Sequence, residues 1–330
     1  MDFDPSKLLG FIPEEQRTDS QREADAAAKA ALPKFGAFML PNPQFAKGDR
    51  ICLWEFWKEP DVVADVGFNF SRFYQYTGSC VGVGGGNALF STIAAQRMAS
   101  ENPTKAFLPF WPSAYGMSRH YMGSDGQGEG SLGSTFAKAL LKDGITDWPN
   151  GNDPDGLPDY KQSEVDGIRI TAQEEYKWSS YRNADLQKLL PKTRKTVLGT
   201  AAELNDVQDI AASTKNGYGV SFACSRYIGN GRIQGSGSDA CVVGSWDSRG
   251  GHQQSIHGYW EHPNLGPLYL ALNSWPASVY PRDPNNFAPV CSTWVTEAKV
   301  QEAMRYSAEV YAFSHQNWFP AQPKVLDWIF

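Results

Sequence analysis

The sequence lacks the features that place many chains in a membrane or an export pathway. Its 330 residues contain no run of about 18 consecutive apolar residues, which a membrane-spanning helix requires. The N-terminal stretch MDFDPSKLLGFIPEEQ has two Asp residues before its first Lys and never sustains an apolar segment, so we expect no secretory signal. These absences predict a soluble chain in the cytoplasm or in an assembled particle such as a virion.

Excess positive charge and paired cysteines are also missing. The chain has 30 Lys and Arg against 36 Asp and Glu, a formal net charge of -6, so it lacks the broad basic surface that binds nucleic acid. Its 5 cysteines are an odd number without a C-x-x-C motif, which argues against a disulfide framework and a structural zinc site. We therefore expect no cofactor, no nucleic-acid partner and no membrane partner.

The apolar content is sufficient for a large core, because 41% of the residues are hydrophobic and 13% are aromatic. Residues 1–45 begin polar, continue into the Ala-rich helical run Gln21–Leu32 and end in a proline-punctuated stretch. We interpret them as an N-terminal arm or a pro-segment-like extension. The main domain is placed at residues 46–310, and an aromatic C-terminal tail at residues 311–330.

Helices are expected in the first half of the main domain and strands in the second. Apolar residues three and four apart predict a helix from about Cys80 to Ser100. A second helix is predicted over Gly133–Lys142, with Ser134 as its cap and Gly144 after its end, and a third within residues 203–217. The later runs YGVSFACS, ACVVGSW, QSIHGYW and LYLALNSW are typical of strands. This order predicts an α+β fold.

Cys80 is the candidate nucleophile. It stands at the predicted start of a helix, whose positive end lowers the pKa of a thiol. The small residues Gly78, Ser79, Gly82 and Gly84 leave open backbone around the sulfur, where a substrate carbonyl could approach and the Cys80 N–H could donate to an oxyanion. Taken alone, a cysteine at a helix start is more often a small buried residue than a nucleophile.

A general base for this thiol must come from the histidines, which are His120, His252, His257, His262 and His315. His252 and His257 are five apart in one predicted strand, so a regular strand would turn them to opposite faces. We favour His252, which follows a Gly-Gly pair at the start of that strand, and expect His257 to pack locally. The amide of Asn273 could accept from the ring N–H of His252, and Trp275 could shield that bond from water.

Three segments in chain order resemble motifs of the papain-like cysteine peptidase family. QYTGSC, from Gln75 to Cys80, resembles Q-G-x-C-G-S-C. His252 with Gly258-Tyr259 resembles H-A-x-x-x-x-G-Y, and Asn273-Ser274-Trp275 resembles N-S-W-G. The resemblance spans about residues 48–310, and on it the chain is identified as a divergent member. It implies a helical subdomain that carries the nucleophile helix, an antiparallel β subdomain that carries the His and Asn, and a cleft between them.

The same resemblance implies a cysteine-type peptidase or related amide hydrolase. Cys80 would attack the substrate carbonyl as a thiolate, His252 would protonate the leaving amine, and Asn273 would orient His252. Gln75 would supply the side chain of the oxyanion hole, and Trp275 would cover the bond between Asn273 and His252. The expected partner is a peptide or protein substrate.

Several positions depart from the family motifs and support a second hypothesis. The spacing from Gln75 to Cys80 is one residue short, Val81 replaces the usual aromatic, Thr77 replaces a disulfide cysteine, and Pro276 replaces the last motif glycine. The alternative is a catalytically inactive structural or binding protein with a papain fold, a component of a virion or another large assembly. Assembly partners would then bind through the N-terminal arm and the C-terminal tail.

Two further patterns favour plain structural explanations. The run GVGGGN, residues 82–87, lacks the spacing of a nucleotide-binding loop, so close approach of the backbone at a substrate cleft or tight helix packing is the preferred explanation. The loop NGNDPDGLPDY, residues 150–160, resembles a calcium loop only at its Asp-x-Asp-Gly-like centre, and a solvated turn is preferred.

Overall fold

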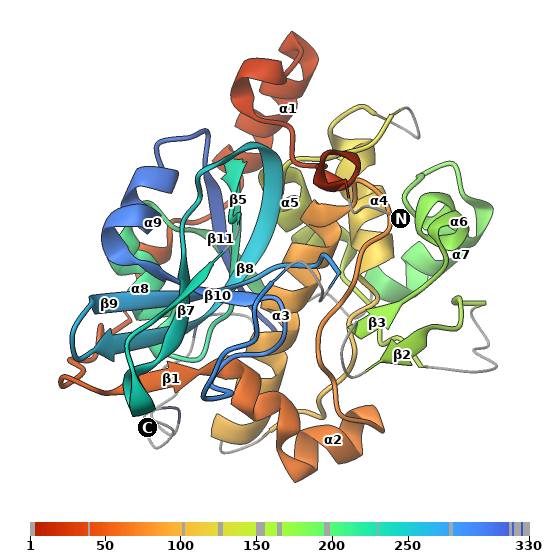
Figure 1. Ribbon diagram of the computed structural model, residues 1–330. Coiled ribbons are helices and arrows are strands. Elements are labelled where there is room, and N and C mark those ends of the chain that lie inside the picture. The colour runs from red at the N-terminus through yellow and green to blue at the C-terminus, as the bar shows by residue number, and fades with distance from the viewer. Residues whose placement is uncertain are drawn as a thin grey trace.

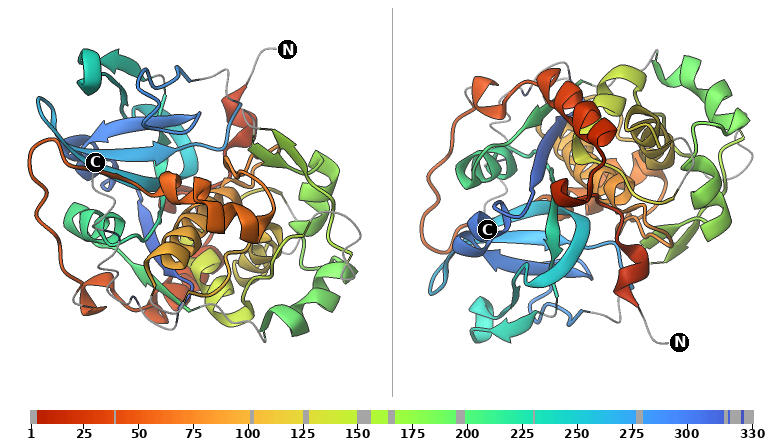
Figure 2. Two further views of the ribbon diagram at one scale, coloured as in Figure 1. Left: turned by 90° about the horizontal axis from the view of Figure 1, so that it is seen from below. Right: turned by 90° about the horizontal axis from the view of Figure 1, so that it is seen from above.

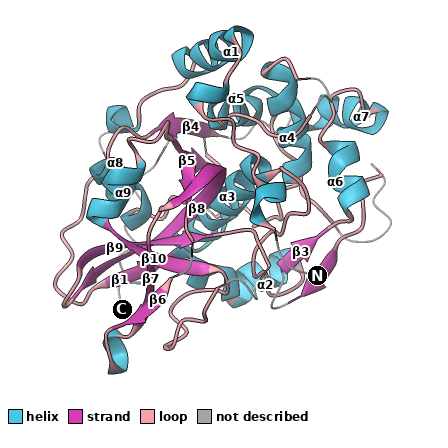
Figure 3. Ribbon diagram, turned by 45° about the horizontal axis from the view of Figure 1, so that its top comes forward, coloured by secondary structure: helices cyan, strands magenta, loops and turns pink. Residues whose placement is uncertain are grey.

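The computed structural model describes most of the chain, namely residues 4–38, 40–100, 103–124, 128–149, 156–163, 167–194, 199–229, 231–276 and 280–316 with Phe319 and Val325. It has one half made mainly of helices and one half built on a sheet (Figure 1). Coloured by secondary structure, most helices and most strands gather in different regions (Figure 3). This arrangement confirms the predicted α+β fold.

The helical half is organised around α3 (Cys80–Ala99), which confirms the helix predicted to start at the candidate nucleophile. Almost every residue of α3 is buried. Around it lie α2 (Pro60–Val66), α4 (Trp111–Tyr121), α5 (Gly133–Asp143), α6 (Ala172–Trp178), α7 (Ala184–Thr193) and the short strands β2 (Lys161–Ser163) and β3 (Gly167–Arg169).

The glycines of α3 allow neighbours to approach from several sides. A Cβ added at Gly82 would lie 2.6 Å from the ring of Trp111, and one at Gly85 would lie 2.3 Å from the ring of Phe136. Such contacts are too short for a close-packed interior. Close packing is therefore confirmed as the reason for the glycine run, and it outweighs a helix cost of up to about 1 kcal/mol for each glycine relative to Ala.

Helix α5 spans the predicted residues and ends before Gly144, but its N-terminal cap differs from the prediction. Ser134 lies inside the first turn, and the N-cap residue, Leu132, makes no side-chain hydrogen bond to the helix. The backbone N–H of Ser134 instead donates to Oε2 of Glu309 at 2.8 Å. The predicted Ser134 cap is therefore wrong, because a carboxylate distant in the sequence binds the positive end of the helix.

The sheet half contains a sheet with the strand order β4-β11-β5-β8-β9-β10-β7-β6, and β1 pairs with β8. Adjacent strands are antiparallel except for the parallel pair of β10 and β7. The strands are β1 (Arg50–Cys52), β4 (Thr200–Glu203), β5 (Val220–Tyr227), β6 (Arg232–Gln234), β7 (Cys241–Gly244), β8 (Ser248–His262), β9 (Gly266–Leu272), β10 (Ser292–Thr296) and β11 (Glu309–Ser314). Helices α8 (Val207–Lys215) and α9 (Glu297–Ala303) pack on this sheet.

The N-terminal arm packs against the rest of the molecule (Figure 2). Its elements are η1 (Pro5–Leu8), η2 (Glu14–Gln16), α1 (Asp19–Ala30) and η3 (Phe35–Phe38). Phe11 and Phe35 are buried in the same core as the main domain. Arg17, also buried, donates to Asp25 at 2.7 Å and forms an ion pair with Glu309 at the start of β11. The arm is therefore anchored to the sheet by a buried charge cluster as well as by apolar contacts.

The C-terminal tail and the loop at residues 150–160 are only partly described by the structure. Tyr311–Ser314, placed in the C-terminal tail, instead form part of β11 and pair with β4, because their apolar side chains are buried in the sheet. Most of the tail beyond them lies outside the described residues. Positions 150–155, on which the calcium-loop alternative rests, lie outside them too.

Candidate active site

Cys80 is the first residue of α3, at the place where this helix meets β8. The side-chain Nε2 of Gln253 donates to the carbonyl of Val81 at 2.8 Å, which joins the start of the helix to the strand. The backbone N–H of Gln253 also offsets part of the rise in the pKa of Cys80 that burial causes. Because His252 immediately precedes Gln253, the packing of α3 on β8 places Cys80 and His252 on two elements that contact each other.

His252 lies on β8, and Asn273 directly follows the end of the neighbouring strand β9. Nε2 of His252 is 2.9 Å from Oδ1 of Asn273, and the same oxygen accepts from the backbone N–H of Ser274 at 2.7 Å. Oδ1 accepts the N–H of Ser274 and is therefore the amide oxygen, which carries no hydrogen and can only accept. The ring nitrogen that faces it, Nε2, must then carry the proton. Nδ1 is buried and has no hydrogen-bond partner in the described part of the chain. It is the nitrogen that remains to take a proton from a thiol.

Trp275 covers this pair. Its ring centroid lies 4.5 Å from that of His252, and the ring of Tyr227 packs against Trp275 at 4.9 Å. Both His252 and Trp275 are 1% exposed. The buried indole therefore lies against the His252 ring.

Gln75 lies next to the same residues, and its carboxamide is held in one orientation. Its Oε1 accepts from the hydroxyl of Ser274, and its Nε2 donates to the carbonyls of Thr77 and Leu8, both at 2.8 Å. Leu8 belongs to the N-terminal arm. A peptide carbonyl of the chain itself therefore occupies the donor that the resemblance assigns to the oxyanion hole.

The arm crosses the candidate site as a bound peptide segment. The N–H of Phe11 donates to the carbonyl of Gly251 at 3.2 Å, next to the candidate base. On the opposite side, Ile12 donates to Ser131 at 3.1 Å and Ser131 donates to Gly10 at 2.7 Å. The arm is thus hydrogen-bonded to the helical half and to the start of β8 at once.

The contact between the arm and the nucleophile leaves no space for another ligand. The sulfur of Cys80 is 0% exposed, and the backbone N–H groups of Gly10 and Phe11 in the arm offset part of the rise in its pKa that burial causes. A Cβ added at Gly10 would lie 1.6 Å from the carbonyl oxygen of Gly78. Only glycine fits at position 10 while the arm lies in this place.

The covered site holds its two titratable groups in their neutral forms. Burial raises the pKa of Cys80 to about 12, although hydrogen bonds from four backbone N–H groups oppose the shift. Burial lowers the pKa of His252 to about 4, and the bond to Asn273 offsets only part of this. The sequence analysis expected a lowered thiol pKa. The structure differs because the sulfur is removed from water, and desolvation disfavours the thiolate more than the helix end favours it.

A buried carboxylate that the sequence analysis missed braces the loop before Cys80. Glu175, on α6, accepts from the N–H groups of Tyr76 and Thr77 at 2.9 and 3.0 Å. It also accepts from the hydroxyls of Thr77, at 2.6 Å, and Ser79. Burial raises the pKa of Glu175, and these hydrogen bonds lower it. The carboxylate thus contacts the residue that replaces the disulfide cysteine of the family motif, and nothing in the local sequence marks it.

His257 packs locally, as expected. The pairing of β8 with β9 shifts between Ile256 and Gly258, so His257 lies at an irregularity of the strand. Its ring stacks on Trp57 with centroids 5.5 Å apart. Burial lowers its pKa to about 3, which keeps the ring neutral inside the core.

The described residues contain neither a metal centre nor a membrane helix. No three His, Cys, Asp or Glu side chains gather there in an arrangement that could bind a metal ion. No helix in the same part of the chain combines the length and the apolar character needed to cross a bilayer.

Solved structures with a similar fold are cysteine proteases. Xylellain, a cysteine protease from Xylella fastidiosa, is similar with a TM-score of 0.52 and 15% identity, over 95% of this chain and 98% of that one. The fold is papain-like. ProCathepsin B from Trypanosoma congolense has a TM-score of 0.48 and 9% identity over 94% and 87% of the two chains. Bromelain from Ananas comosus has a TM-score of 0.42 and 10% identity, over 81% of this chain and 99% of that one. No family model and no curated protein sequence matches this chain.

Proposed function

We propose that the chain is a cysteine peptidase, or a related amide hydrolase, that acts by thiolate acyl transfer. The observation that carries this proposal is the 2.9 Å contact between His252 Nε2 and Asn273 Oδ1. This contact leaves Nδ1 of the ring for Cys80, which begins a helix next to the strand of His252. A nucleophile, a base and a group that orients the base are the parts that acyl transfer needs.

The reaction follows from these positions. Nδ1 of His252 takes the proton of the Cys80 thiol, and the sulfur adds to the carbonyl carbon of an amide. The oxyanion that forms is stabilised by the N–H of Cys80 and by Nε2 of Gln75. The imidazolium protonates the leaving amine as the C–N bond breaks. Water, deprotonated by the same imidazole, then cleaves the thioester and releases the acid and the thiol.

The N-terminal arm holds this enzyme in a covered form. The carbonyl of Leu8 accepts a hydrogen bond from Nε2 of Gln75, and the N–H groups of Gly10 and Phe11 act on the pKa of Cys80, which is fully buried. When the arm leaves, water returns to the thiol and the imidazole. The pKa of Cys80 then falls and that of the imidazole rises, which favours a thiolate–imidazolium pair.

The test displaces the arm in the full chain with a single methyl group. In Gly10→Ala the added Cβ would lie 1.6 Å from the carbonyl oxygen of Gly78, so the arm must move away. Gly36→Ala is the matched control, because Gly36 is also in the arm and its Cβ would come no closer than 3.9 Å to a neighbouring atom. Both variants are treated with an epoxysuccinyl or iodoacetamide probe from about pH 4 to about pH 9, and the labelled cysteine is located by mass spectrometry.

We expect Cys80 to be labelled selectively below about pH 7 in Gly10→Ala but not in Gly36→Ala, together with hydrolysis of a casein substrate. Adding Cys80→Ala to Gly10→Ala should abolish that hydrolysis. Labelling of Cys80 without hydrolysis of casein or of small peptide amides would contradict the peptidase assignment.

The inactive assembly protein is the second candidate, and one observation favours it. Cys80 is 0% exposed and its pKa is about 12 in this structure, as in a cysteine that serves only to pack. If Cys80 stays unreactive below about pH 8 after the arm is displaced, this candidate is preferred. The arm and the tail would then be the segments that bind partners.

A further inference from the structure

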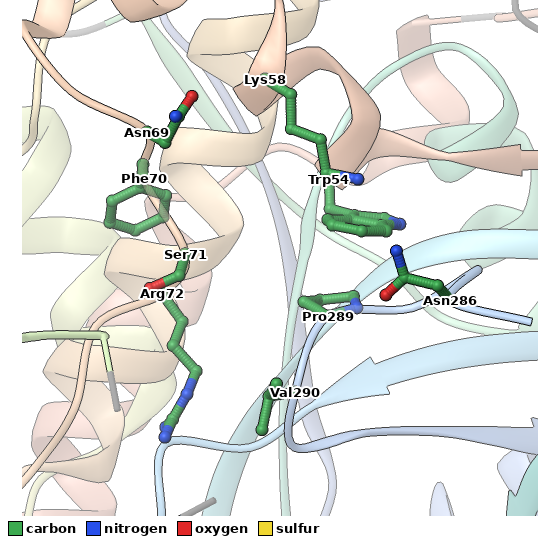
Figure 4. Close-up of a pocket in the computed structure, with 9 residues that line it drawn as sticks. All are labelled: Trp54, Lys58, Asn69, Phe70, Ser71, Arg72, Asn286, Pro289 and Val290. Atoms are coloured by element: carbon green, nitrogen blue, oxygen red, sulfur yellow. The ribbon is translucent and has the colours of Figure 1, made fainter. Parts of the chain in front are cut away.

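A second cavity lies apart from the candidate active site. It is formed by residues 69–72, the loop 286–290 and η4 (Leu53–Lys58), and its volume is about 350 Å³. Its lining residues are Trp54, Lys58, Asn69, Phe70, Ser71, Arg72, Asn286, Pro289 and Val290 (Figure 4). None of them belongs to the candidate catalytic set. The volume is within the range of small-molecule sites, which begins at about 300 Å³.

The cavity combines apolar walls with positive charge. Phe70 lies on one side of it and Trp54, Pro289 and Val290 lie on the other, and its two charged lining residues, Lys58 and Arg72, are both cations. This is a local concentration of positive charge in a chain whose formal net charge is -6. Such a site favours a ligand with an apolar body and a negative group.

The two cations lie at different depths. The side chain of Lys58 is 40% exposed, and its Nζ lies 3.0 Å from the ring centroid of Trp54 and 3.3 Å from Glu55. Arg72 is only 1% exposed. Lys58 is therefore at the mouth of the cavity, where its charge is already partly balanced, and Arg72 is at the inner end.

Arg72 is the observation that points to a ligand. Its Nη1 makes a long hydrogen bond of 3.4 Å to the carbonyl of Asn273, whereas Nε and Nη2 are buried without a hydrogen-bond partner among the described residues. No acidic side chain in that part of the structure forms an ion pair with it. A guanidinium keeps its charge when buried, and a buried charge without a counter-ion is costly. An anion beside Arg72 would remove that cost.

We propose that this cavity binds a small organic carboxylate. The carboxylate pairs with Arg72 at the inner end, because a planar guanidinium offers two parallel N–H groups that match its two oxygens. The apolar body lies between Phe70 and the pair Pro289 and Val290, and Trp54 closes it from above. The ligand thus contacts residues 69–72, which lead to the candidate oxyanion-hole glutamine, and a loop that leads into β10.

The test measures binding of phenylacetate to the full chain by isothermal titration calorimetry, with phenylacetamide as the neutral analogue of the same shape. We expect phenylacetate to bind at least about tenfold more tightly than phenylacetamide, because only the carboxylate pairs with Arg72. Arg72→Met should remove this preference, whereas Lys188→Met, on a side chain that is 78% exposed, should leave it unchanged. Equal affinities for the two compounds, or no saturable binding up to about 10 mM, would overturn the proposal.

A second variant keeps the proposal testable if Arg72→Met does not fold. Val290→Trp fills the cavity without changing any charge, and it should abolish phenylacetate binding in a chain that unfolds at a normal temperature. Cys80→Ala should bind phenylacetate as the parent chain does, so the result is independent of whether the chain is a peptidase. If Val290→Trp folds and still binds, or if Cys80→Ala abolishes binding, the carboxylate does not lie in this cavity.

Discussion

The candidate active site and the Arg72 cavity are both concave regions, but they differ in how their polar groups are satisfied. At the candidate active site, the carbonyl of Leu8 in the arm accepts from Gln75, and Cys80 is fully buried, so the chain itself covers the positions that a substrate would take. In the cavity, two nitrogens of a buried Arg72 have no partner in the described structure. The arm of the same chain covers the candidate active site, whereas the proposed ligand of the Arg72 cavity would have to come from outside the chain.

The largest effect is expected from removing the base. In the arm-displaced Gly10→Ala chain, His252→Ala should lower kcat by about 10⁴-fold, since the thiol then has no proton acceptor. Peptide hydrolysis measures this loss, and phenylacetate binding in the same variant should stay unchanged. A variant that retains more than about a tenth of the activity would show that His252 is not the base.

Acid should weaken the fold through the two buried histidines. The pKa of His252 is lowered to about 4 and that of His257 to about 3, so in acid the unfolded chain binds protons that the folded chain does not. Stability is therefore full above the unfolded value of about 6.5 and falls as the pH drops towards 4, by about 2 kcal/mol for each histidine at pH 5. Urea unfolding at pH 7 and pH 5 measures the change.

His257→Gln separates the two contributions, because it removes one titrating ring and leaves His252 in place. About half of the acid loss should disappear in this variant. Phenylacetate binding should be nearly constant over the same pH range, because Arg72 stays charged and the carboxylate stays ionised. A parent chain equally stable at pH 5 and pH 7 would contradict the buried neutral histidines.

The anchor of the arm should have a smaller effect. Arg17→Met removes the cation that pairs with Glu309 and Asp25, and leaving buried carboxylates without it should weaken arm docking by about 3 kcal/mol. Labelling of Cys80 should then be at least about tenfold faster than in the parent chain. Arg22→Met is the control, because Arg22 lies nearby in α1, the helix of Asp25, with its side chain 47% exposed. If labelling does not change, the cover over Cys80 is independent of this anchor.

Local sequence patterns predicted the elements, whereas long-range contacts decided the electrostatics of the site. The spacing of apolar residues predicted α3, and the ordered motifs named Gln75, Cys80, His252 and Asn273. Hydrogen bonds join His252 to Asn273 and Gln75 to Ser274. The effect of the arm on the thiol pKa could not be predicted, because it depends on which distant segment lies on the sulfur. The missing Ser134 cap has the same cause, since its replacement comes from β11.

Glu175 is the clearest case of such a long-range contact, and it makes the smallest predicted effect the most informative. Its four hydrogen bonds fix residues 76–79, which separate Gln75 from Cys80, so it acts as a positioning residue for the oxyanion donors. In the Gly10→Ala chain, Glu175→Gln should lower kcat by about tenfold with little change in KM, because a carboxamide turns one acceptor into a donor that faces an N–H.

The matched control is Glu174→Gln on the same helix. The Glu174 side chain is 35% exposed, and its Oε2 forms a long ion pair of 3.9 Å with Nζ of Lys177. A purely structural role for Glu175 would lower the unfolding temperature of both the covered and the arm-displaced chains and leave kcat unchanged. A positioning role lowers kcat selectively, since a displaced Gln75 stabilises the oxyanion less in the transition state while substrate binding is unaffected. The ratio of the effects on kcat and KM therefore decides whether Glu175 positions this loop by hydrogen bonds, in place of the disulfide that Thr77 cannot form.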